Sequence, residues 1–286
     1  MMVVTGTLLT LAALLAVAAA LCTCAVLVSF TLAWRQPPHR PSTRRQPVAP
    51  ALALWLIGSE VACLLATLML RPLGWRRATI VSRPARCTPV ILLHGLFQNR
   101  SCLLLLQWRL RAAGYDRVVS LNTPAWWELK RLVDEVAGSV ARLRQTTGSD
   151  RVHLVGHSMG GILARCYLQQ PESAGTVAAC VTLGTPHQGT RLAPLAISRH
   201  GRSLGPASPL LARLNRSPLP AGVHFTAIAS RHDNIIVPAE HARMQGADAV
   251  ELSGLGHTAL LFSSQAARAV VAALEEREEV RDHLDH

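Results

Sequence analysis

The stretch Val152–Gly161, which reads VHLVGHSMGG, decides how the rest of the chain is interpreted. It begins as a short apolar strand, passes through the G-x-S-x-G pattern of residues 156–160, and continues into a helix expected over 162–169. A side chain at Gly156 or Gly160 would collide with the neighbouring strand or helix where the backbone reverses. The pattern predicts a sharp strand-to-helix turn that presents the Ser158 hydroxyl at a helix N-terminus, where amide groups favour a developing negative charge. Because G-x-S-x-G alone also occurs by chance, the remaining sequence has to support this interpretation.

Strand-length and helix-length segments alternate from Thr88 onward. We expect strands over 89–93, 117–121, 152–155, 177–183, 224–229 and 249–252, and helices over 101–113, 128–145, 162–169 and 258–275. Buried strands joined by helical crossovers indicate an α/β protein with a mostly parallel sheet and helices on both faces.

A serine hydroxyl is a weak nucleophile at neutral pH, so it needs a base, and the base needs an orienting acid. Downstream of Ser158, Asp233 follows one predicted strand and His257 follows the last. Functional groups in open parallel sheets lie at the carboxyl ends of the strands, so these side chains are expected to meet. We predict Ser158 as the catalytic nucleophile, Asp233 as the acid and His257 as the base.

Other residues are weaker candidates for these roles. Asp248 precedes a strand and Glu240 begins a helix-like run, so both are second choices to Asp233. His157 flanks the serine and is expected to shape the turn. His187 lies in a loop and is expected to line the site.

Two backbone amides are needed to stabilise the oxyanion of a tetrahedral intermediate. The amide of Met159 directly follows the serine and is the first expected donor. The second is expected in the loop after strand 89–93, where Gly95 permits a sharp turn. The oxyanion hole is therefore predicted at the amides of Leu96 and Met159, with Phe97 as the second choice for the former.

Composition narrows the classes of partner. The formal net charge is +12, and Lys130 is the only lysine among 29 basic residues. Without a nucleic-acid-binding motif, this excess of arginine fits membrane headgroups better than nucleic acid. The seven cysteines form no spaced framework, although Cys87 and Cys102 could pair in an oxidising compartment. No His/Cys cluster has metal-ligand spacing, so neither a metal nor a cofactor is expected.

The N-terminal third divides into three segments. Residues 1–34 are uncharged and exceed the ~20 residues that cross a bilayer, and the lack of a positive n-region favours an uncleaved transmembrane helix over a signal peptide. Residues 35–50 form a Pro/Arg-rich connector, and 51–72 form a second apolar helix that would complete a transmembrane hairpin. Glu60 interrupts this second helix, so either it faces the first helix or the segment lies in the membrane interface. Residues 73–286 remain for the α/β domain.

Arginines set the expected topology. The positive-inside rule places the connector in the cytoplasm, and a second span would then deliver the α/β domain to the outer, periplasmic side of a bacterial inner membrane. Arginines after residue 70 argue against this side. If 51–70 does not span, the domain is cytoplasmic.

Five separated segments resemble one known family: PVILLHGLFQN, RVHLVGHSMGGILARCYL, VTLGTPHQGT, SRHDNIIVP and GLGHTALLFSSQ. Together, over roughly 87–275, they resemble the bacterial lipase and esterase branch of the α/β-hydrolase superfamily. The resemblance implies the α/β-hydrolase fold, the triad and oxyanion hole named above, and no cofactor. It also implies a lid-like insert at 187–222. The side chains expected to contact substrate are Phe97, Trp126, Trp127 and His187.

The leading hypothesis is a membrane-anchored serine hydrolase that cleaves carboxylic, acyl-lipid esters through an acyl-enzyme. One alternative is an acyltransferase that uses the same triad. Another is a non-catalytic membrane scaffold with a hydrolase-like domain, which the ordered Ser, Asp and His residues disfavour.

Overall fold

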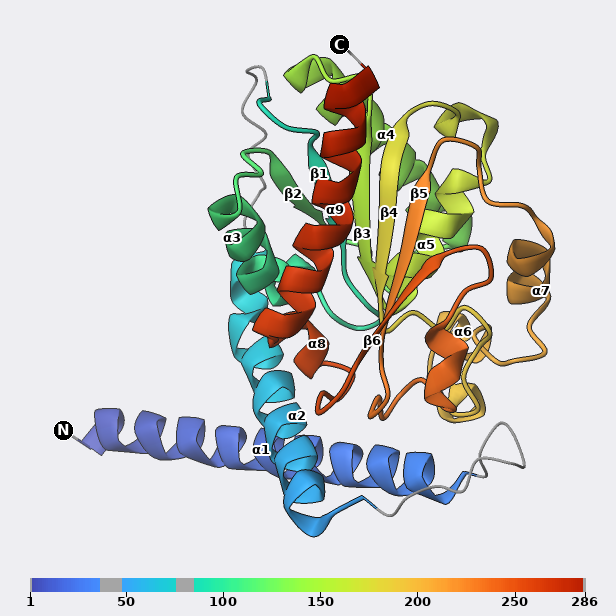
Figure 1. The fold of residues 1–286 in the computed structure, drawn as a ribbon. Coiled ribbons are helices and arrows are strands. Elements are labelled where there is room, and N and C mark those ends of the chain that lie inside the picture. The colour runs from blue at the N-terminus through green and yellow to red at the C-terminus, as the bar shows by residue number, and fades with distance from the viewer. Residues whose placement is uncertain (1, 37–47, 76–84, 285–286) are drawn as a thin grey trace.

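A computed structural model describes residues 2–36, 48–75 and 85–284 of the chain. Most of the predicted connector, residues 37–47, lies outside the described residues. Figure 1 shows a twisted sheet between two layers of helices, with two long N-terminal helices at one end of it.

The sheet contains six described strands, all parallel, in the order β2-β1-β3-β4-β5-β6. The strands are β1 (Val90–Leu93), β2 (Val118–Leu121), β3 (Val152–His157), β4 (Val177–Leu183), β5 (His224–Ser230) and β6 (Asp248–Leu252). Each begins or ends within two residues of its predicted bounds. β1, β3 and β4 are buried along their whole length, which is the pattern of a parallel sheet covered on both faces.

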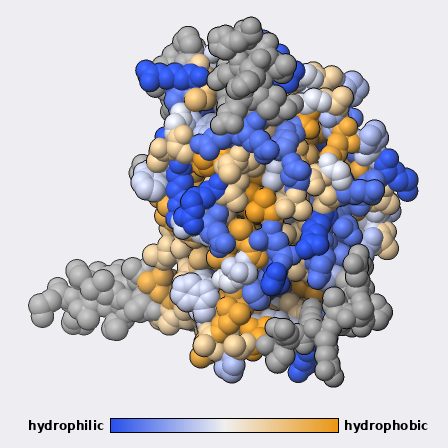
Figure 2. All heavy atoms as spheres, in the orientation of Figure 1, coloured by the Kyte–Doolittle hydropathy of each residue, from blue (hydrophilic) through white to orange (hydrophobic). Residues whose placement is uncertain are grey.

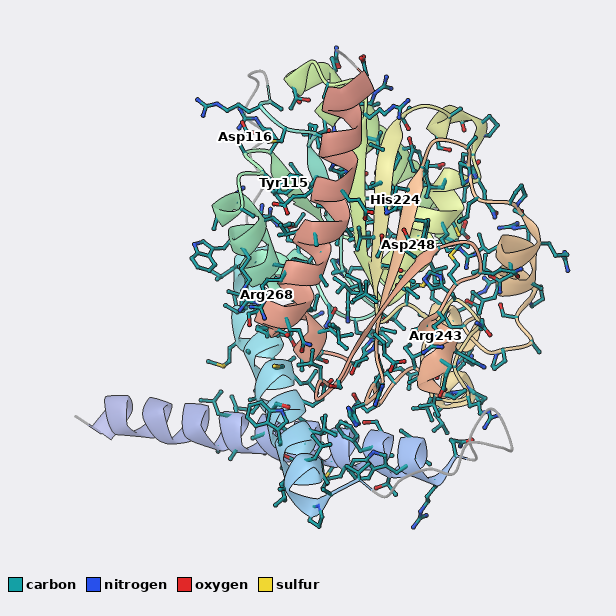
Figure 3. All side chains as sticks on the ribbon, viewed as in Figure 1. Tyr115, Asp116, His224, Arg243, Asp248 and Arg268 are labelled. Atoms are coloured by element: carbon teal, nitrogen blue, oxygen red, sulfur yellow. The ribbon has the colours of Figure 1, made fainter. Side chains whose placement is uncertain are left out.

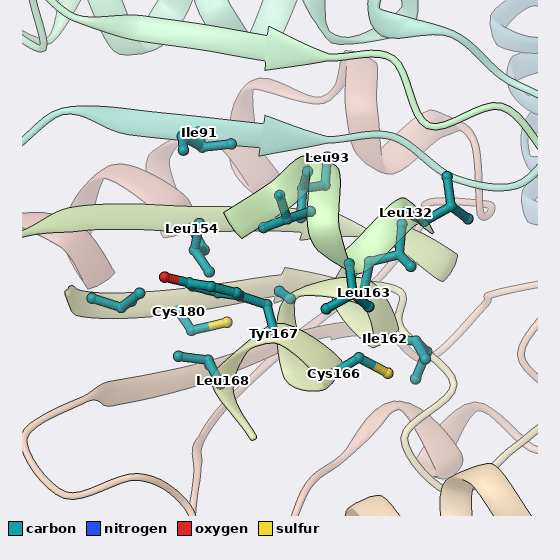
Figure 4. Close-up of a cluster of buried hydrophobic side chains, with 14 of the residues drawn as sticks. Ile91, Leu93, Leu132, Leu154, Ile162, Leu163, Cys166, Tyr167, Leu168 and Cys180 are labelled. Carbon is teal, nitrogen blue, oxygen red and sulfur yellow. The ribbon is translucent and has the colours of Figure 1, made fainter. Parts of the chain in front are cut away.

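Helices cover the two faces of this sheet (Figure 1). On one face lie α4 (Leu129–Thr147) and α5 (Met159–Leu168), and on the other lie α3 (Leu104–Ala112), α8 (Ala259–Phe262) and α9 (Ser264–Leu284). Figure 4 shows part of the hydrophobic core between the sheet and helices α4 and α5, in which Tyr167 of α5 packs among leucines of the sheet. Its hydroxyl bonds Thr176 Oγ1 at 2.8 Å, which satisfies the one polar atom of this large buried side chain.

The helix predicted over 258–275 is divided into two. Ser263 has extended backbone angles (φ −76°, ψ 131°) and separates α8 from α9. Its Oγ accepts hydrogen bonds from the amides of Gln265 and Ala266, so it acts as the N-cap of α9. The division lets the chain change direction at Ser263, between α8 and α9.

Two apolar helices precede the sheet: α1 (Met2–Arg35) and α2 (Pro50–Leu70), the latter followed by η1 (Arg71–Trp75). Among the described residues, the stretches Ala13–Arg35 and Pro50–Trp75 are long and apolar enough to cross a membrane. The two helices pack together through Val26, Phe30 and Leu56. Figure 1 shows α1 passing across the carboxyl ends of the strands and α2 rising beside α3 and α8. Figure 2 shows apolar side chains exposed at this end.

The predicted insert 187–222 contains short helices only. They are η4 (Ala193–Leu195), α6 (Arg199–Arg202) and α7 (Pro209–Arg216). Leu211 and Leu214 of α7 are buried in the main core, whereas Leu195 and Ile197 are 65% and 83% exposed. The first part of the insert therefore presents apolar side chains to solvent, and the second part is anchored. Other short turns of helix are η2 (Arg100–Leu103), η3 (Pro171–Ser173) and η5 (Ala239–Ala242).

Candidate active site

Ser158 lies on the strand-to-helix turn that the sequence predicts. Its backbone has φ 54° and ψ −121°, an unfavourable conformation for a residue with a Cβ. Two hydrogen bonds hold the turn: the Ser158 amide donates to Leu183 O at 2.9 Å, and Thr185 Oγ1 donates to Ser158 O at 3.1 Å. A side chain at Gly160 would overlap the carbonyl of Leu93, so β1 and α5 approach closely because glycine stands there.

Asp233 and His257 form a buried pair on the loops after β5 and β6. His257 Nδ1 donates to Asp233 Oδ2 at 2.9 Å, which leaves Nε2 without its proton and able to accept one. The other carboxylate oxygen of Asp233 accepts the amides of Ile235 and Ile236, each at 2.8 Å. The carboxylate is therefore fixed from three directions, and it fixes the tautomer of the imidazole.

Burial and charge act against each other at His257. Burial alone would lower the pKa of the imidazole, but the negative charges of Asp233 and Glu60 and the hydrogen bond to Asp233 outweigh it. The pKa of His257 therefore lies above its ordinary value. A base of this kind is readily protonated when a nucleophile gives up its proton.

Two further histidines, His94 and His157, support the site as neutral groups. Burial, together with the nearby His257, holds the pKa of His157 well below its usual range. Its Nε2 donates to the His257 carbonyl at 3.1 Å, so it positions the base from beneath. Burial also lowers the pKa of His94 to about 4. His94 donates to Gly95 O at 2.8 Å and accepts the Thr123 amide at 2.9 Å, which fixes the Gly95 turn.

The two predicted oxyanion donors flank Ser158. Met159 is the first residue of α5, and Leu96 lies in the loop after β1. This loop comes very close to the serine, because a Cβ built on Gly95 would lie 3.1 Å from Ser158 Cβ. Their donation to an oxyanion stays a prediction.

A pocket of about 630 Å³ contains Ser158 and His257 in its wall. Its lining is largely apolar; most of it comes from α1, α2, the Gly95 loop and the insert, and the rest includes the Ser158 turn and the loops after β5 and β6. Among the described lining residues there is no aspartate or glutamate, and Arg71 carries the one formal charge other than that of a protonated histidine. The site is therefore suited to an uncharged, apolar group next to the serine.

The predicted substrate contacts are only partly brought together. Phe97 lines the Ser158 pocket, with its backbone at φ 59°. Trp126 and Trp127 instead line a separate surface hollow that Phe97 also borders. His187 is fully buried, bonded to Thr182 Oγ1 and Arg165, and does not line either hollow. The structure thus places His187 in the core because a buried arginine needs an acceptor there.

The second-choice acids do not reach the site. Asp248 Oδ2 lies 3.1 Å from Nε2 of His224, at the amino-terminal ends of β6 and β5 (Figure 3). Ser158 lies at the opposite, carboxyl edge of the sheet. Glu240 is in η5 and likewise lines no part of the pocket.

Glu60, Ser29 and Asn234 are the residues that sequence reasoning missed at this site. Glu60 was expected to face α1, or else to lie in a segment at the membrane interface. Its carboxylate accepts the amides of Thr258 and Ala259, the two residues directly after His257. A lone carboxylate inside an otherwise apolar helix was the available signal, and its partners could not be found without the tertiary structure.

None of the seven cysteines forms a disulfide, and Cys87 Sγ instead donates to Gly114 O at 3.6 Å. Among the residues that the structure describes, no group of three or more His, Cys, Asp or Glu side chains could hold a metal ion.

Comparisons with known proteins agree with the fold. A family model described as the alpha/beta hydrolase fold matches residues 88–200. A proline iminopeptidase of Heyndrickxia coagulans is 38% identical over 103 residues, which are 32% of this chain and 33% of that protein. The chain thus matches about a third of the length of this curated relative.

Solved structures give the same result. A Bacillus licheniformis lipase, BlEst2 in mature form, aligns with a TM-score of 0.57 at 18% identity, over 68% of this chain and 96% of that one. Aspergillus fumigatus lipase B aligns with a TM-score of 0.59 at 18% identity, over 85% of this chain and 61% of that one. The chain therefore has the α/β-hydrolase fold, as its five motifs predicted.

His257, His94 and His157 should titrate at clearly different pH values. On lowering the pH from 8, we expect His257 to protonate first, because its pKa is raised above the ordinary histidine value, whereas burial lowers the pKa of His94 to about 4 and holds that of His157 well below its usual range. Asp233→Asn should lower the pKa of His257, because it removes the main charge that stabilises the imidazolium. NMR titration of ring-labelled histidine measures both. A wild-type His257 that titrates below pH 6 would contradict the geometry.

Proposed function

We propose that this protein is a serine hydrolase that cleaves carboxylic esters with apolar acyl chains. The single observation that carries the proposal is the shared pocket: Ser158 on its strained turn and the Asp233-bound His257 open into one apolar cavity. Ser158 Oγ attacks the ester carbonyl while His257 Nε2 takes its proton. The oxyanion is held by the amides of Leu96 and Met159. His257 then protonates the leaving alcohol, and water releases the acyl group by the same route.

An apolar acyl chain fits this cavity better than a peptide does. An aminopeptidase has to bind the α-ammonium group of its substrate, which calls for a carboxylate near the nucleophile. The pocket offers none among its described lining residues, although one relative of the chain is a proline iminopeptidase. The acyl chain would instead lie between Leu64 and Leu68 of α2 and Val28 and Leu32 of α1.

The activity is tested with a fluorophosphonate probe on detergent-solubilised protein. We expect labelling of the wild type, none of Ser158→Ala, and labelling slowed by a factor on the order of 10³ or more in His257→Ala. Turnover of p-nitrophenyl esters should follow the same order, with proline p-nitroanilide not cleaved.

Folded wild type that stays unlabelled even in mixed micelles would favour the scaffold alternative. Release of acylated acceptor instead of free acid, with a competing alcohol present, would favour the acyltransferase.

Pocket shape predicts a chain-length effect. Leu68→Trp would fill part of the cavity, whereas Met69→Trp, one residue along α2, changes an exposed side chain that does not line it. We expect Leu68→Trp to lower kcat/KM for a C12 ester about tenfold or more relative to a C4 ester. Met69→Trp should leave that ratio unchanged. Equal effects of the two variants on the ratio would place the acyl chain elsewhere.

Membrane attachment is proposed through α1. Residues 2–21 of α1 form about 30 Å of helix ahead of Cys22, which is the first buried residue among those of α1 whose burial is described, and this length matches the hydrocarbon core. In α2 only ten residues, Pro50–Ser59, precede the docked Glu60, and they reach about 15 Å. We therefore favour a single span by α1, with α2 held against the domain.

This single span changes the expected side of the membrane. The α/β domain then lies on the same side as the arginine-rich connector, in the cytoplasm, and not on the outer side. A C-terminal green fluorescent protein fusion should fluoresce in a bacterial host, and a C-terminal alkaline phosphatase fusion should be inactive. The opposite pair of results would restore the two-span arrangement.

A further inference from the structure

The loop that carries His257 is held from the α/β domain and, in part, from the N-terminal helices outside it. Glu60, on the apolar helix α2, is 2% exposed. One of its oxygens accepts the Thr258 amide at 2.7 Å and the other accepts the Ala259 amide at 2.9 Å. Both oxygens thus accept from backbone donors, which a carboxylate does and a protonated acid does less well.

Gly256 belongs to the same contact. A Cβ built on this glycine would overlap an oxygen of Glu60, so the carboxylate occupies the space that a side chain would need. The Glu60 carboxylate therefore lies directly against the residue before His257 and bonds the two residues after it.

Two further contacts link the same loop to the N-terminal helices. Ser29 of α1 accepts Asn234 Nδ2 at 2.7 Å, and Asn234 Oδ1 accepts the His257 amide at 2.9 Å. Trp55 Nε1 of α2 donates to Gly254 O at 3.1 Å. The backbone of the loop 254–259 is thus bonded at four points to α1 and α2, directly or through one side chain.

We propose that Glu60 is a positioning residue for the base, and that the N-terminal helix pair, α1 and α2, forms part of the active site in addition to the membrane attachment proposed for α1. Glu60 fixes the position and orientation of the His257 imidazole, because it hydrogen-bonds the backbone of the two residues that follow His257. Burying a carboxylate costs several kcal/mol in a generic protein interior, and an apolar helix would not keep one without partners of this quality. The inference rests on the proposed role of His257 as the base.

Burial raises the pKa of Glu60, whereas the Thr258 and Ala259 amides and His257 favour its ionised form, which places a second negative charge near the imidazole. The titratable groups that face His257 are Asp233 from the loop after β5, Glu60 from α2 and His157 from β3, and His157 stays neutral. Losing Glu60 should therefore lower the pKa of His257 as well as disturb its position. A residue that only stabilised the fold would not produce this shift.

The test compares Glu60→Gln, Glu60→Asp and the control Ser59→Ala in the full-length protein. Gln keeps the size but presents an amide donor to one of the two backbone donors. Asp keeps the charge on a shorter side chain. Ser59 is the neighbouring residue, and its hydroxyl bonds only Leu56 O of its own helix among the hydrogen bonds found for it.

We expect Glu60→Gln to lower kcat for a short-chain ester by about 10- to 100-fold, with KM within about twofold of the wild type, because the base is displaced and not the binding pocket. The acid limb of its kcat/KM profile should move to lower pH. Glu60→Asp should lose rate while its acid limb stays near that of the wild type. Ser59→Ala should match the wild type in both respects.

NMR titration of His257 gives a readout that does not depend on turnover. A lower His257 pKa in Glu60→Gln, in protein that melts as one folded species, supports the proposal even if the ester hypothesis fails the Ser158→Ala test. Unchanged kcat and an unchanged His257 pKa in Glu60→Gln would overturn it. A rate loss with an unmoved acid limb and an unmoved pKa would overturn it equally, since Glu60 would then act on the fold alone.

Discussion

The strand-to-helix turn at Ser158 is the constraint on which the site depends. A non-glycine residue at φ 54° and ψ −121° costs about 1–3 kcal/mol, and the surrounding structure has to outweigh that cost. It does so with the Leu183 and Thr185 hydrogen bonds and with close packing of α5 on β1, which glycine at position 160 permits. The serine is thereby held at the carboxyl edge of the sheet, where the loops after β1, β5 and β6 converge.

Around that turn, each buried polar side chain is held in place by hydrogen bonds to its neighbours. Asp233 is fixed by two amides and in turn fixes His257. His157 and His94, both neutral, hold the backbone beneath the base and the Gly95 turn. Because each of these groups is buried, each needs its partner, and the network sets the tautomers without any group having to move.

The N-terminal helices join this arrangement in two ways. Their apolar side chains form part of the wall of the pocket, and three of their polar side chains, Ser29, Trp55 and Glu60, bond the loop that carries His257 directly or through Asn234. Under the anchoring proposed for α1, these contacts would couple membrane attachment to the geometry of the site. A domain expressed without these helices would expose the amides of Thr258 and Ala259 and leave an open apolar pocket.

Sequence alone was sufficient for the sheet, the turn and the candidate triad. Strand periodicity is local, G-x-S-x-G has a local steric meaning, and Asp233 and His257 follow strands whose carboxyl ends must share one edge. The sequence alone could not show that His187 is buried in the core, or that Trp126 and Trp127 line a different hollow from Ser158. It also could not show that Glu60 bonds the backbone next to His257. Each of these placements depends on partners between 5 and about 200 positions away along the chain. Hydropathy marked α1 and α2 as apolar but could not tell lipid from protein as their surroundings, because both offer a low dielectric to leucine. Only the tertiary structure showed that the carboxylate of Glu60 in α2 is buried and bonded to two backbone amides of the α/β domain, because those amides lie about 200 positions away along the chain.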